Sequence, residues 1–144
     1  MIDNFRGHHS FLSNFYPVKI FLWGIEYQTA EHAYQCQKTT TNSDWQMVYY
    51  AATPGLAKRI ARCVAIRSDW DKYKLVVMRE VLACKFSEER MTNLLLSTGT
   101  QELVEGNAWN DRFWGVCRGV GQNYLGKLLM ELRENIRTIR AQQS

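Results

Sequence analysis

The sequence lacks the features that mark several protein classes. It has no long apolar run that would span a membrane and no signal-like start. Its four cysteines lie far apart without a Cys-x-x-Cys pair, and the only adjacent histidines are His8 and His9. This pattern does not match a zinc site. We therefore expect a cytoplasmic protein with no membrane contact, reduced and mostly buried cysteines, no metal and no cofactor.

The charge and glycine patterns exclude little else. The net charge is +4 and the basic residues are scattered, which suits an anionic small ligand or a modest nucleic-acid contact but requires neither. Gly119 and Gly121 precede a helical pattern, yet Tyr124 stands where the third glycine of a dinucleotide fingerprint would fall. A standard dinucleotide-binding turn is therefore not expected.

Length and periodicity predict the fold class. The 144 residues, of which 46% are hydrophobic and 22% charged, suit a single globular domain spanning residues 1–144. Residues 18–27 predict a β-hairpin that turns at Gly24, and the segments around it have helical periodicity. We expect an α+β fold: a mostly helical single domain with a small β-sheet or hairpin.

Capping residues predict where the helices begin. The first helix starts at about Thr29, and Asp44 caps a second. Pro54 and Gly55 interrupt the chain before helical periodicity resumes at Leu56. A further helix starts at Ser68 or Asp69. Its expected core face is Tyr73, Val76, Val77, Met78, Val81, Leu82 and Phe86. Ser87 is expected to cap the next helix and Gly99 to end it.

The first helix carries an unusual polar stripe. Glu31, Tyr34, Gln35 and Lys38 are spaced to share one helix face, where an ordinary amphipathic helix would place apolar residues. Such a row of groups is typical of a cleft. The alternative is structural, because a glutamate in the first turn and a lysine at the end both favour the helix dipole.

Two other stretches offer groups for a ligand. Residues 5–17 are rich in aromatics and turn formers and predict an ordered loop that presents polar side chains. Lys58 lies on a basic helix face with Arg59 and Arg62, which suits a phosphate or simple exposure to water. Lys85 is the one unexplained polar residue of an otherwise apolar helix face.

Residues 103–115 predict a strand that leads into a functional loop. Asp111 and Trp114 fit such a loop, and Trp109 with Trp114 suits either a stacking wall for a planar base or ordinary packing. The next helix begins after Gly121 and Asn123. Its free backbone N–H groups would form a seat for an anion.

Several motifs in order resemble the NADAR, or YbiA-like, family. They lie at residues 5–7, 11–17, 27–38, 69–71, 85–86, 111–115 and 121–130, and so cover nearly the whole chain. The resemblance implies an α+β fold and N-glycosidase activity on phosphorylated ribosyl intermediates of the riboflavin pathway. It also implies, for some relatives, removal of ADP-ribose from guanine in nucleic acid. It assigns the motif glutamate, lysine and aspartate to Glu31, Lys38 and Asp111, and the motif tryptophan to Trp114.

The chemistry of such a bond agrees with these residue types. Cleavage builds positive charge on the ribose and sends electrons to the leaving nitrogen, which requires a carboxylate and a proton donor. Glu31 and Asp111 supply carboxylates. A neutral Lys38 offers a second route, in which the amine attacks the sugar and forms a Schiff base.

We predict that Glu31, Lys38, Asp111 and Trp114 converge on one pocket. The predicted substrate-binding residues are Arg6, Ser13, Asn14, Phe15, Tyr34, Lys58, Lys85, Trp114, Gly121 and Asn123. The expected substrate is a phosphorylated ribosyl or ADP-ribosyl compound, with ADP-ribosylated nucleic acid as one form. Two alternatives stay open. One is a non-catalytic module that binds ADP-ribose or a nucleotide, and the other is a small nucleic-acid-binding protein.

Overall fold

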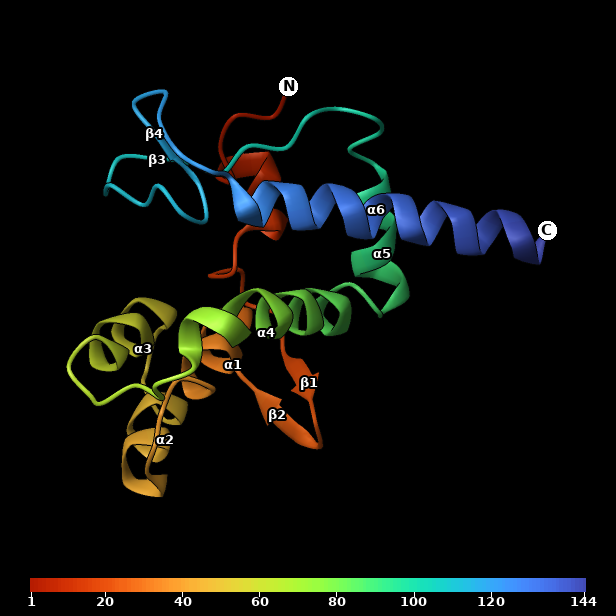
Figure 1. The fold of residues 1–144 in the computed structure, drawn as a ribbon. Coiled ribbons are helices and arrows are strands. Elements are labelled where there is room, and N and C mark those ends of the chain that lie inside the picture. Colours follow the sequence, from red (N-terminus) through yellow and green to blue (C-terminus); the bar gives the residue numbers. More distant parts are fainter. The chain divides into compact units, whose positions relative to one another are not determined.

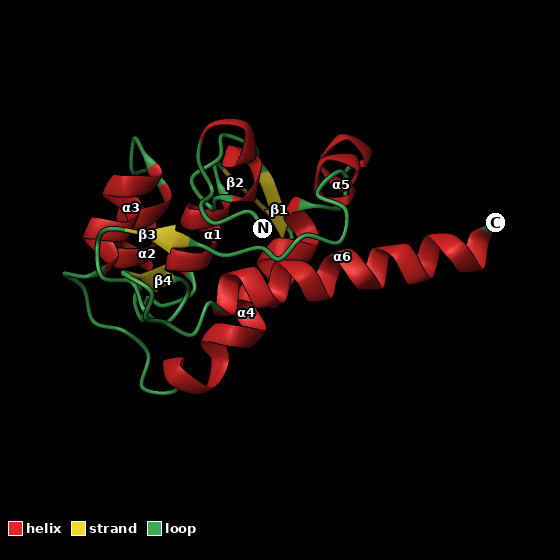
Figure 2. Ribbon diagram, turned by 90° about the horizontal axis from the view of Figure 1, so that it is seen from above, coloured by secondary structure: helices red, strands yellow, loops and turns green.

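In a computed structural model, which describes residues 1–144, the protein is mostly helical with four short strands (Figure 1, Figure 2). The chain forms two compact units. The central unit is Asn14–Lys85, and the terminal unit is Met1–Ser13 together with Phe86–Ser144. The predicted α+β class with a small hairpin is confirmed. One domain over residues 1–144 stays a prediction.

The central unit begins with the predicted hairpin. Strands β1 (Ile20–Leu22) and β2 (Ile25–Tyr27) pair in antiparallel register. Trp23 and Gly24 join them with φ values of 48° and 84°. Positive φ at both central positions is the geometry of the tight hairpin turn whose twist matches that of the strands. Contacts with both strands position helix α1, which follows directly.

Helix α1 (Ala30–Cys36) is buried along its whole length. The helix begins beside Thr29, as predicted, and Thr29 caps it, because its hydroxyl accepts from the backbone N–H of His32 at 3.2 Å. The imidazole of His32 lies 3.0 Å from the Ala51 carbonyl through Nε2 and 2.8 Å from the Thr29 hydroxyl through Nδ1. Since a carbonyl only accepts, Nε2 donates, and in a neutral ring Nδ1 accepts. These bonds fix the start of α1.

Helices α2 (Asn42–Tyr49) and α3 (Pro54–Ala61) pack on α1. Both begin earlier than predicted. Thr41, not Asp44, caps α2, and Thr53 caps α3 with Pro54 inside its first turn. A proline is tolerated at that position because the first N–H groups of a helix have no partner within the helix. Pro54 therefore starts α3 and does not separate it from Leu56.

Helix α4 (Trp70–Lys85) packs on β1 and α1. Its buried stripe includes Val77, Met78, Val81 and Leu82, as predicted. The prediction for two others is wrong. Tyr73 and Val76 are 45% and 48% exposed, so they lie outside the buried stripe of the helix. The ring of Tyr73 instead receives the guanidinium of Arg67 at 4.9 Å.

The terminal unit contains the 3-10 helix η1 (Gly7–Leu12), helices α5 (Glu89–Leu96) and α6 (Tyr124–Gln143), and a parallel strand pair. The pair is β3 (Gly106–Asn107) with β4 (Val116–Cys117). The ordered segment predicted near the N-terminus includes η1, whose Phe11 and Leu12 are buried. Glu88, not Ser87, occupies the N-cap position of α5, and Gly99 adopts φ 65° just after the helix.

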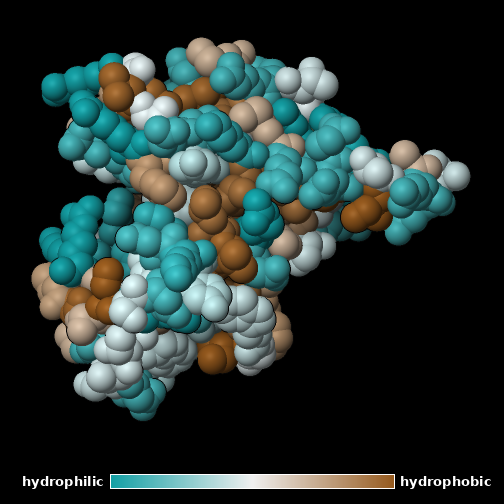
Figure 3. All heavy atoms as spheres, in the orientation of Figure 1, coloured by the Kyte–Doolittle hydropathy of each residue, from teal (hydrophilic) through white to brown (hydrophobic).

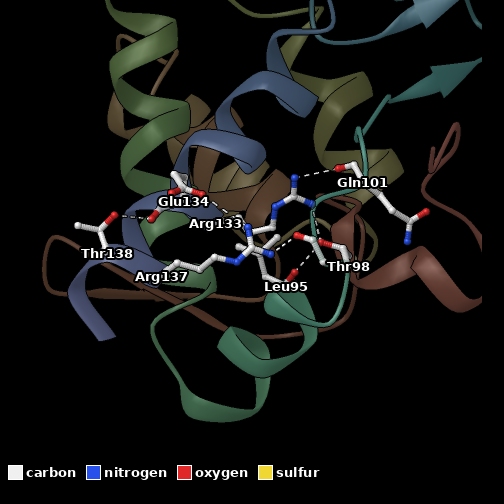
Figure 4. A network of polar contacts seen from close by, with 8 residues as sticks. Leu95, Thr98, Gln101, Arg133, Glu134, Arg137 and Thr138 are labelled. Carbon is white, nitrogen blue, oxygen red and sulfur yellow. Dashed lines mark hydrogen bonds and ion pairs between the residues drawn. The ribbon is translucent and has the colours of Figure 1, made fainter. Parts of the chain in front are cut away.

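Two arginines of α6 hold the turn that follows α5 (Figure 4). The buried guanidinium of Arg133 donates to the Thr98 hydroxyl at 2.8 Å and to the Gln101 carbonyl at 2.8 Å. The Thr98 hydroxyl in turn donates to the last turn of α5 at the Leu95 carbonyl, at 2.6 Å. Arg137 donates to the Gly99 carbonyl. The turn is thereby tied to α6 through neutral acceptors.

Two of the four cysteines are buried, fewer than the sequence predicted. Cys36 and Cys117 are buried and Cys63 is exposed, and none of the cysteines forms a disulfide. On the face drawn in Figure 3, hydrophobic side chains are interspersed with hydrophilic ones. None of the helices combines the length and the apolar character that a membrane span requires.

Candidate active site

Glu31 is a buried carboxylate in the first turn of α1. It is only 6% exposed, and its Oε1 accepts from the side-chain amide of Gln35 at 2.7 Å. Its backbone N–H donates to the carbonyl of Asn14 at 3.0 Å. A glutamate that only complemented the helix dipole would gain nothing from burial, because transferring its carboxylate out of water is costly. The burial of Glu31 therefore disfavours the purely structural interpretation.

Lys38 follows α1 in the turn after its C-cap, so the polar stripe continues two residues past the end of the helix. Its backbone is held at both ends: its N–H donates to the Gln35 carbonyl at 3.2 Å, and its carbonyl accepts from Arg67 at 2.9 Å. The half-buried amine lies 5.7 Å from the centre of the Tyr34 ring. A fixed backbone and a ring under the side chain limit where the amine reaches.

The surroundings of Lys38 favour its neutral form. Burial is the largest effect and lowers the pKa of the amine. The negative charge of Glu31 acts in the opposite direction and raises that pKa. Three cations on the helices packed against α1 lower the pKa of Lys38 further: Lys58, Arg62 and Lys74. The net shift is downward, which increases the fraction of amine able to attack carbon.

Lys85 is a second buried amine of the central unit. It is 2% exposed, at the end of the apolar stripe of α4, and lies 6.0 Å from the centre of the Tyr16 ring. Burial lowers the pKa of Lys85 to about 7. A lysine in such a position carries a cost in stability that packing alone does not explain.

Asp111 shapes the loop that carries Trp114 in the terminal unit. Its Oδ1 accepts from the backbone N–H groups of Phe113 and Trp114 at 3.2 and 2.9 Å. Its own N–H donates to the Asn107 side chain at 3.0 Å. The Asn107 amide also donates to the Glu105 carboxylate at 2.9 Å. Asp111 thus has a clear local role beside its predicted catalytic one.

Gly115 lets this loop close on the residues that support it. A Cβ added there would lie 1.7 Å from the Glu105 carboxylate and 2.1 Å from the Glu105 carbonyl. Any other residue would force the loop apart. Trp114 is half-buried and its neighbour Phe113 packs edge-on against it at 4.8 Å, whereas Trp109 is 54% exposed.

The start of α6 differs from the prediction. We expected free N–H groups there, but those of residues 122–125 donate to the carbonyls of residues 112–115 at 2.8 to 3.2 Å. The Asn123 side chain is engaged as well, accepting from the Glu105 N–H and donating to the Leu103 carbonyl, each at 2.9 Å. The prediction of an anion seat made of free donors is therefore wrong, because the preceding loop already occupies them.

The other predicted substrate-binding residues are divided between the units. Arg6 and Ser13 belong to the terminal unit, where Arg6 is exposed. Asn14, Phe15 and Lys58 belong to the central unit. That the residues of both units serve one pocket stays a prediction, and so does each binding role, including that of Gly121.

The central unit also contains residues that the sequence did not single out. Gln35 was part of the polar stripe but had no assigned role, and its spacing from Glu31 was the available signal. Arg62 was visible as part of a basic helix face. Nothing in the sequence connected Lys74 with Lys38, because it lies on another helix.

Comparison with known proteins identifies relatives over most of the chain. N-glycosidase Npun_R5314 of Nostoc punctiforme is 40% identical over 134 residues, which are 88% of this chain and 85% of that protein. N-glycosidase YbiA of Escherichia coli is 37% identical over 130 residues, covering 86% and 79%. Riboflavin biosynthesis protein VVA0006 of Vibrio vulnificus is 36% identical over 133 residues, covering 90% of this chain but 36% of that longer protein.

A solved structure and a family description agree with these matches. The NMR structure of Escherichia coli YbiA superposes with a TM-score of 0.85 at 34% identity, covering 98% of this chain and 89% of that one. The NADAR domain description matches residues 4–137. The chain therefore belongs to the NADAR domain family, as its sequence motifs predicted.

Proposed function

We propose that this chain is an N-glycosidase that hydrolyses the ribosyl–nitrogen bond of a phosphorylated ribosyl compound. The observation that carries the proposal is the pairing, along α1 and the turn after it, of a buried carboxylate at Glu31 with an amine of lowered pKa at Lys38. The names of two relatives, both N-glycosidases, support the reaction class.

The first step uses the Lys38 amine as a nucleophile. The neutral amine attacks the anomeric carbon and forms a carbon–nitrogen bond while the bond to the base breaks. The departing base takes the electron pair and a proton. Glu31 stabilises the positive charge that develops on the ribose and transfers protons at the reacting atoms.

The second step releases the sugar. The ring oxygen leaves the anomeric carbon with its electron pair, takes a proton, and leaves a Schiff base between Lys38 and the opened sugar. Water then adds to the Schiff base, the carbon–nitrogen bond breaks, and the sugar departs as an aldehyde with Lys38 regenerated. No electrons are gained or lost overall, so the reaction is a hydrolysis.

The competing route is direct displacement by water. In that route Glu31 and Asp111 share proton transfer and charge stabilisation, and Lys38 acts only as a positive charge. The lowered pKa of Lys38 favours the covalent route, because an amine that served only as a cation would gain from a normal or raised pKa. A non-catalytic module that only binds ADP-ribose would also use Lys38 as a cation, so the lowered pKa counts against that alternative as well.

The phosphate of the substrate is assigned to the cations around Lys38. Lys58 and Arg62 lie on α3 or at its end, and the charges of both act on Lys38. A phosphate binds well to such paired cations. The name of the Vibrio vulnificus relative favours a riboflavin-pathway intermediate as the substrate, and ADP-ribosylated guanine is the alternative.

Release of the free base from defined substrates tests the proposal. The protein is incubated with a phosphoribosyl-aminopyrimidine and, separately, with DNA that carries ADP-ribosylated guanine. We expect release from one of them, and loss of that release in Glu31→Gln and Lys38→Met. Glu89→Gln is the matched control, because Glu89 is an exposed glutamate in the first turn of α5. Absence of base release from both substrates would overturn the proposal.

A further inference from the structure

Two residues that contact Glu31 each have a side-chain amide oxygen that is buried without a hydrogen-bond partner. They are Oε1 of Gln35 and Oδ1 of Asn14, and their side chains belong to residues that are 3% and 7% exposed. Folded proteins pair the great majority of their buried acceptors, because leaving one unpaired costs its full desolvation penalty. Two such acceptors on residues that contact Glu31 therefore need an explanation.

The partners of the two amides fix which atom is left over. The Glu31 carboxylate is an acceptor, so the NH₂ group of Gln35 must face it, at 2.7 Å, and Oε1 points elsewhere. The NH₂ group of Asn14 faces the sulfur of Met78 at 3.3 Å, which leaves Oδ1 as the remaining acceptor. Both leftover atoms can only receive a hydrogen bond, so they select for a donor.

Gln35 contacts Glu31 through its side-chain amide, and Asn14 contacts Glu31 through its main chain. Gln35 contacts the carboxylate itself, and the main-chain carbonyl of Asn14 accepts from the Glu31 N–H at 3.0 Å. The unpaired oxygen of Gln35 therefore belongs to the side chain that directly contacts the carboxylate which the proposed function places at the anomeric carbon, and the backbone of Asn14 adjoins the same residue.

We propose that Gln35 and Asn14 form a subsite that accepts hydrogen bonds from the hydroxyl groups of the substrate sugar. Gln35 receives the 2-hydroxyl and Asn14 a second hydroxyl. This inference rests on the proposed function. The 2-hydroxyl is on the carbon next to the anomeric carbon, and Gln35 is the amide in direct contact with the carboxylate assigned to that carbon. The subsite selects ribosyl over 2-deoxyribosyl compounds.

The expected selectivity is large because the acceptor is buried. A site built to pair with a substrate hydroxyl rejects the analogue that lacks it, since binding the analogue leaves the acceptor unpaired. Holding Glu31 in place requires only the NH₂ group of Gln35. A preference for ribose that depends on Gln35 would therefore indicate that Gln35 recognises the sugar, because a residue that only held Glu31 in place would give no such preference.

Binding of the sugar product tests the subsite independently of catalysis. Ribose 5-phosphate and 2-deoxyribose 5-phosphate are titrated calorimetrically into the wild-type protein and into Gln35→Met, which keeps the length of the side chain but has no acceptor oxygen. We expect the wild type to prefer ribose 5-phosphate by about 10²-fold or more, and the variant to lose most of that preference. Asn14→Leu should weaken both sugars equally and keep the ratio.

Gln37→Met is the matched control. Gln37 is the C-cap residue of the same helix, and its amide donates only within the protein, to Tyr27 at 3.1 Å and to the Ala33 carbonyl at 2.9 Å. This variant should keep the wild-type preference. Thermal melting of each variant verifies that it is folded.

The outcomes separate this inference from the proposed function. Equal binding of the two sugars by the wild type, or an unchanged preference in folded Gln35→Met, overturns the subsite even if base release is observed. A preference that depends on Gln35, found in a protein that releases no base, supports the subsite and overturns only the catalytic proposal. If Gln35→Met fails to fold, Gln35→Lys is used, because it keeps an N–H donor toward the Glu31 carboxylate but has no acceptor oxygen. It must lose the preference for ribose, and a retained preference overturns the subsite.

Discussion

The charge of Glu31 opposes the effect of burial on the amine of Lys38. Burial lowers the pKa of Lys38, and the carboxylate raises it. When Glu31 is protonated, its charge disappears and the amine becomes easier to deprotonate. The two groups are therefore coupled, so that a proton gained by the acid favours the nucleophilic form of the base.

This coupling predicts two effects of Glu31→Gln. Turnover should fall by about 10²-fold or more, because an amide cannot transfer the proton. The pKa of Lys38 should also fall further, so the amine should react with formaldehyde and borohydride at a lower pH than in the wild type. Base release and the pH dependence of lysine methylation measure the two effects. Near-normal turnover would leave Glu31 with only a structural role.

A covalent adduct on Lys38 is the second prediction. Borohydride added during turnover should reduce the Schiff base and leave the opened sugar attached to Lys38, as detected by mass spectrometry of peptides. Lys38→Arg keeps the positive charge but stays protonated, so it should abolish both the adduct and turnover. Substantial activity in Lys38→Arg without an adduct would favour direct attack by water.

The cations around Lys38 provide the third prediction. Replacing Lys58 and Arg62 by Met removes two positive charges that lower the pKa of Lys38, so that pKa should rise. Because the attacking amine must be neutral, the acidic limb of the pH–rate profile should move to higher pH. We expect a shift of less than about one pH unit, since partly exposed charges are screened.

Lys72→Met is the control for these charge effects. Lys72 is exposed on α4 and is not among the residues that shift Lys38. The same double variant should raise KM for a phosphorylated substrate, because a phosphate would lose two partners. A profile that does not move in the double variant would contradict the electrostatic account of Lys38.

Local sequence signals predicted much of the fold. The glycine turn between two short apolar strands gave the hairpin, and Thr29 gave the start of α1. Local signals failed where several residues compete for one role. Thr41 and Asp44 are both good caps, and the helix begins at the first of them. The exposure of Tyr73 and Val76 depends on how α4 is rotated against its neighbours.

The candidate site was predictable in its residue types but not in its environment. The polar stripe on α1 identified Glu31 and Lys38, yet the burial of Glu31 and the cations that act on Lys38 come from helices distant in sequence. The start of α6 shows the opposite case. A helix start after glycines suggested free donors, but the chain just before it folds back and uses them.

Asp111→Asn separates the two roles of Asp111. Asparagine keeps the Oδ1 acceptor for the N–H groups of Phe113 and Trp114, so the loop should persist with a loss of stability of about 1 kcal/mol or less. If the charge takes part in the reaction, turnover should still fall by about 10²-fold. Melting temperature and base release measure these effects. Full activity in Asp111→Asn would restrict Asp111 to shaping the loop.

Lys85→Met should make the protein more stable, and by an amount that depends on pH. Burial lowers the pKa of Lys85 to about 7 in the folded protein, whereas a lysine in the unfolded chain titrates near about 10.4. Between these values the unfolded chain binds a proton that the folded protein does not. The contribution of Lys85 to the free energy of unfolding of the wild type therefore rises with pH, by at most about 1.4 kcal/mol per pH unit.

The advantage of Lys85→Met over the wild type should then be largest below about pH 7 and shrink toward about pH 10. Urea denaturation of both proteins at a series of pH values measures it, with Lys127→Met as the exposed-lysine control. If Lys85 binds substrate as predicted, Lys85→Met should also have a higher KM. A buried lysine that lowers stability would then be retained because substrate binding needs it. A stability difference that does not change with pH would show that Lys85 keeps its proton when the chain folds.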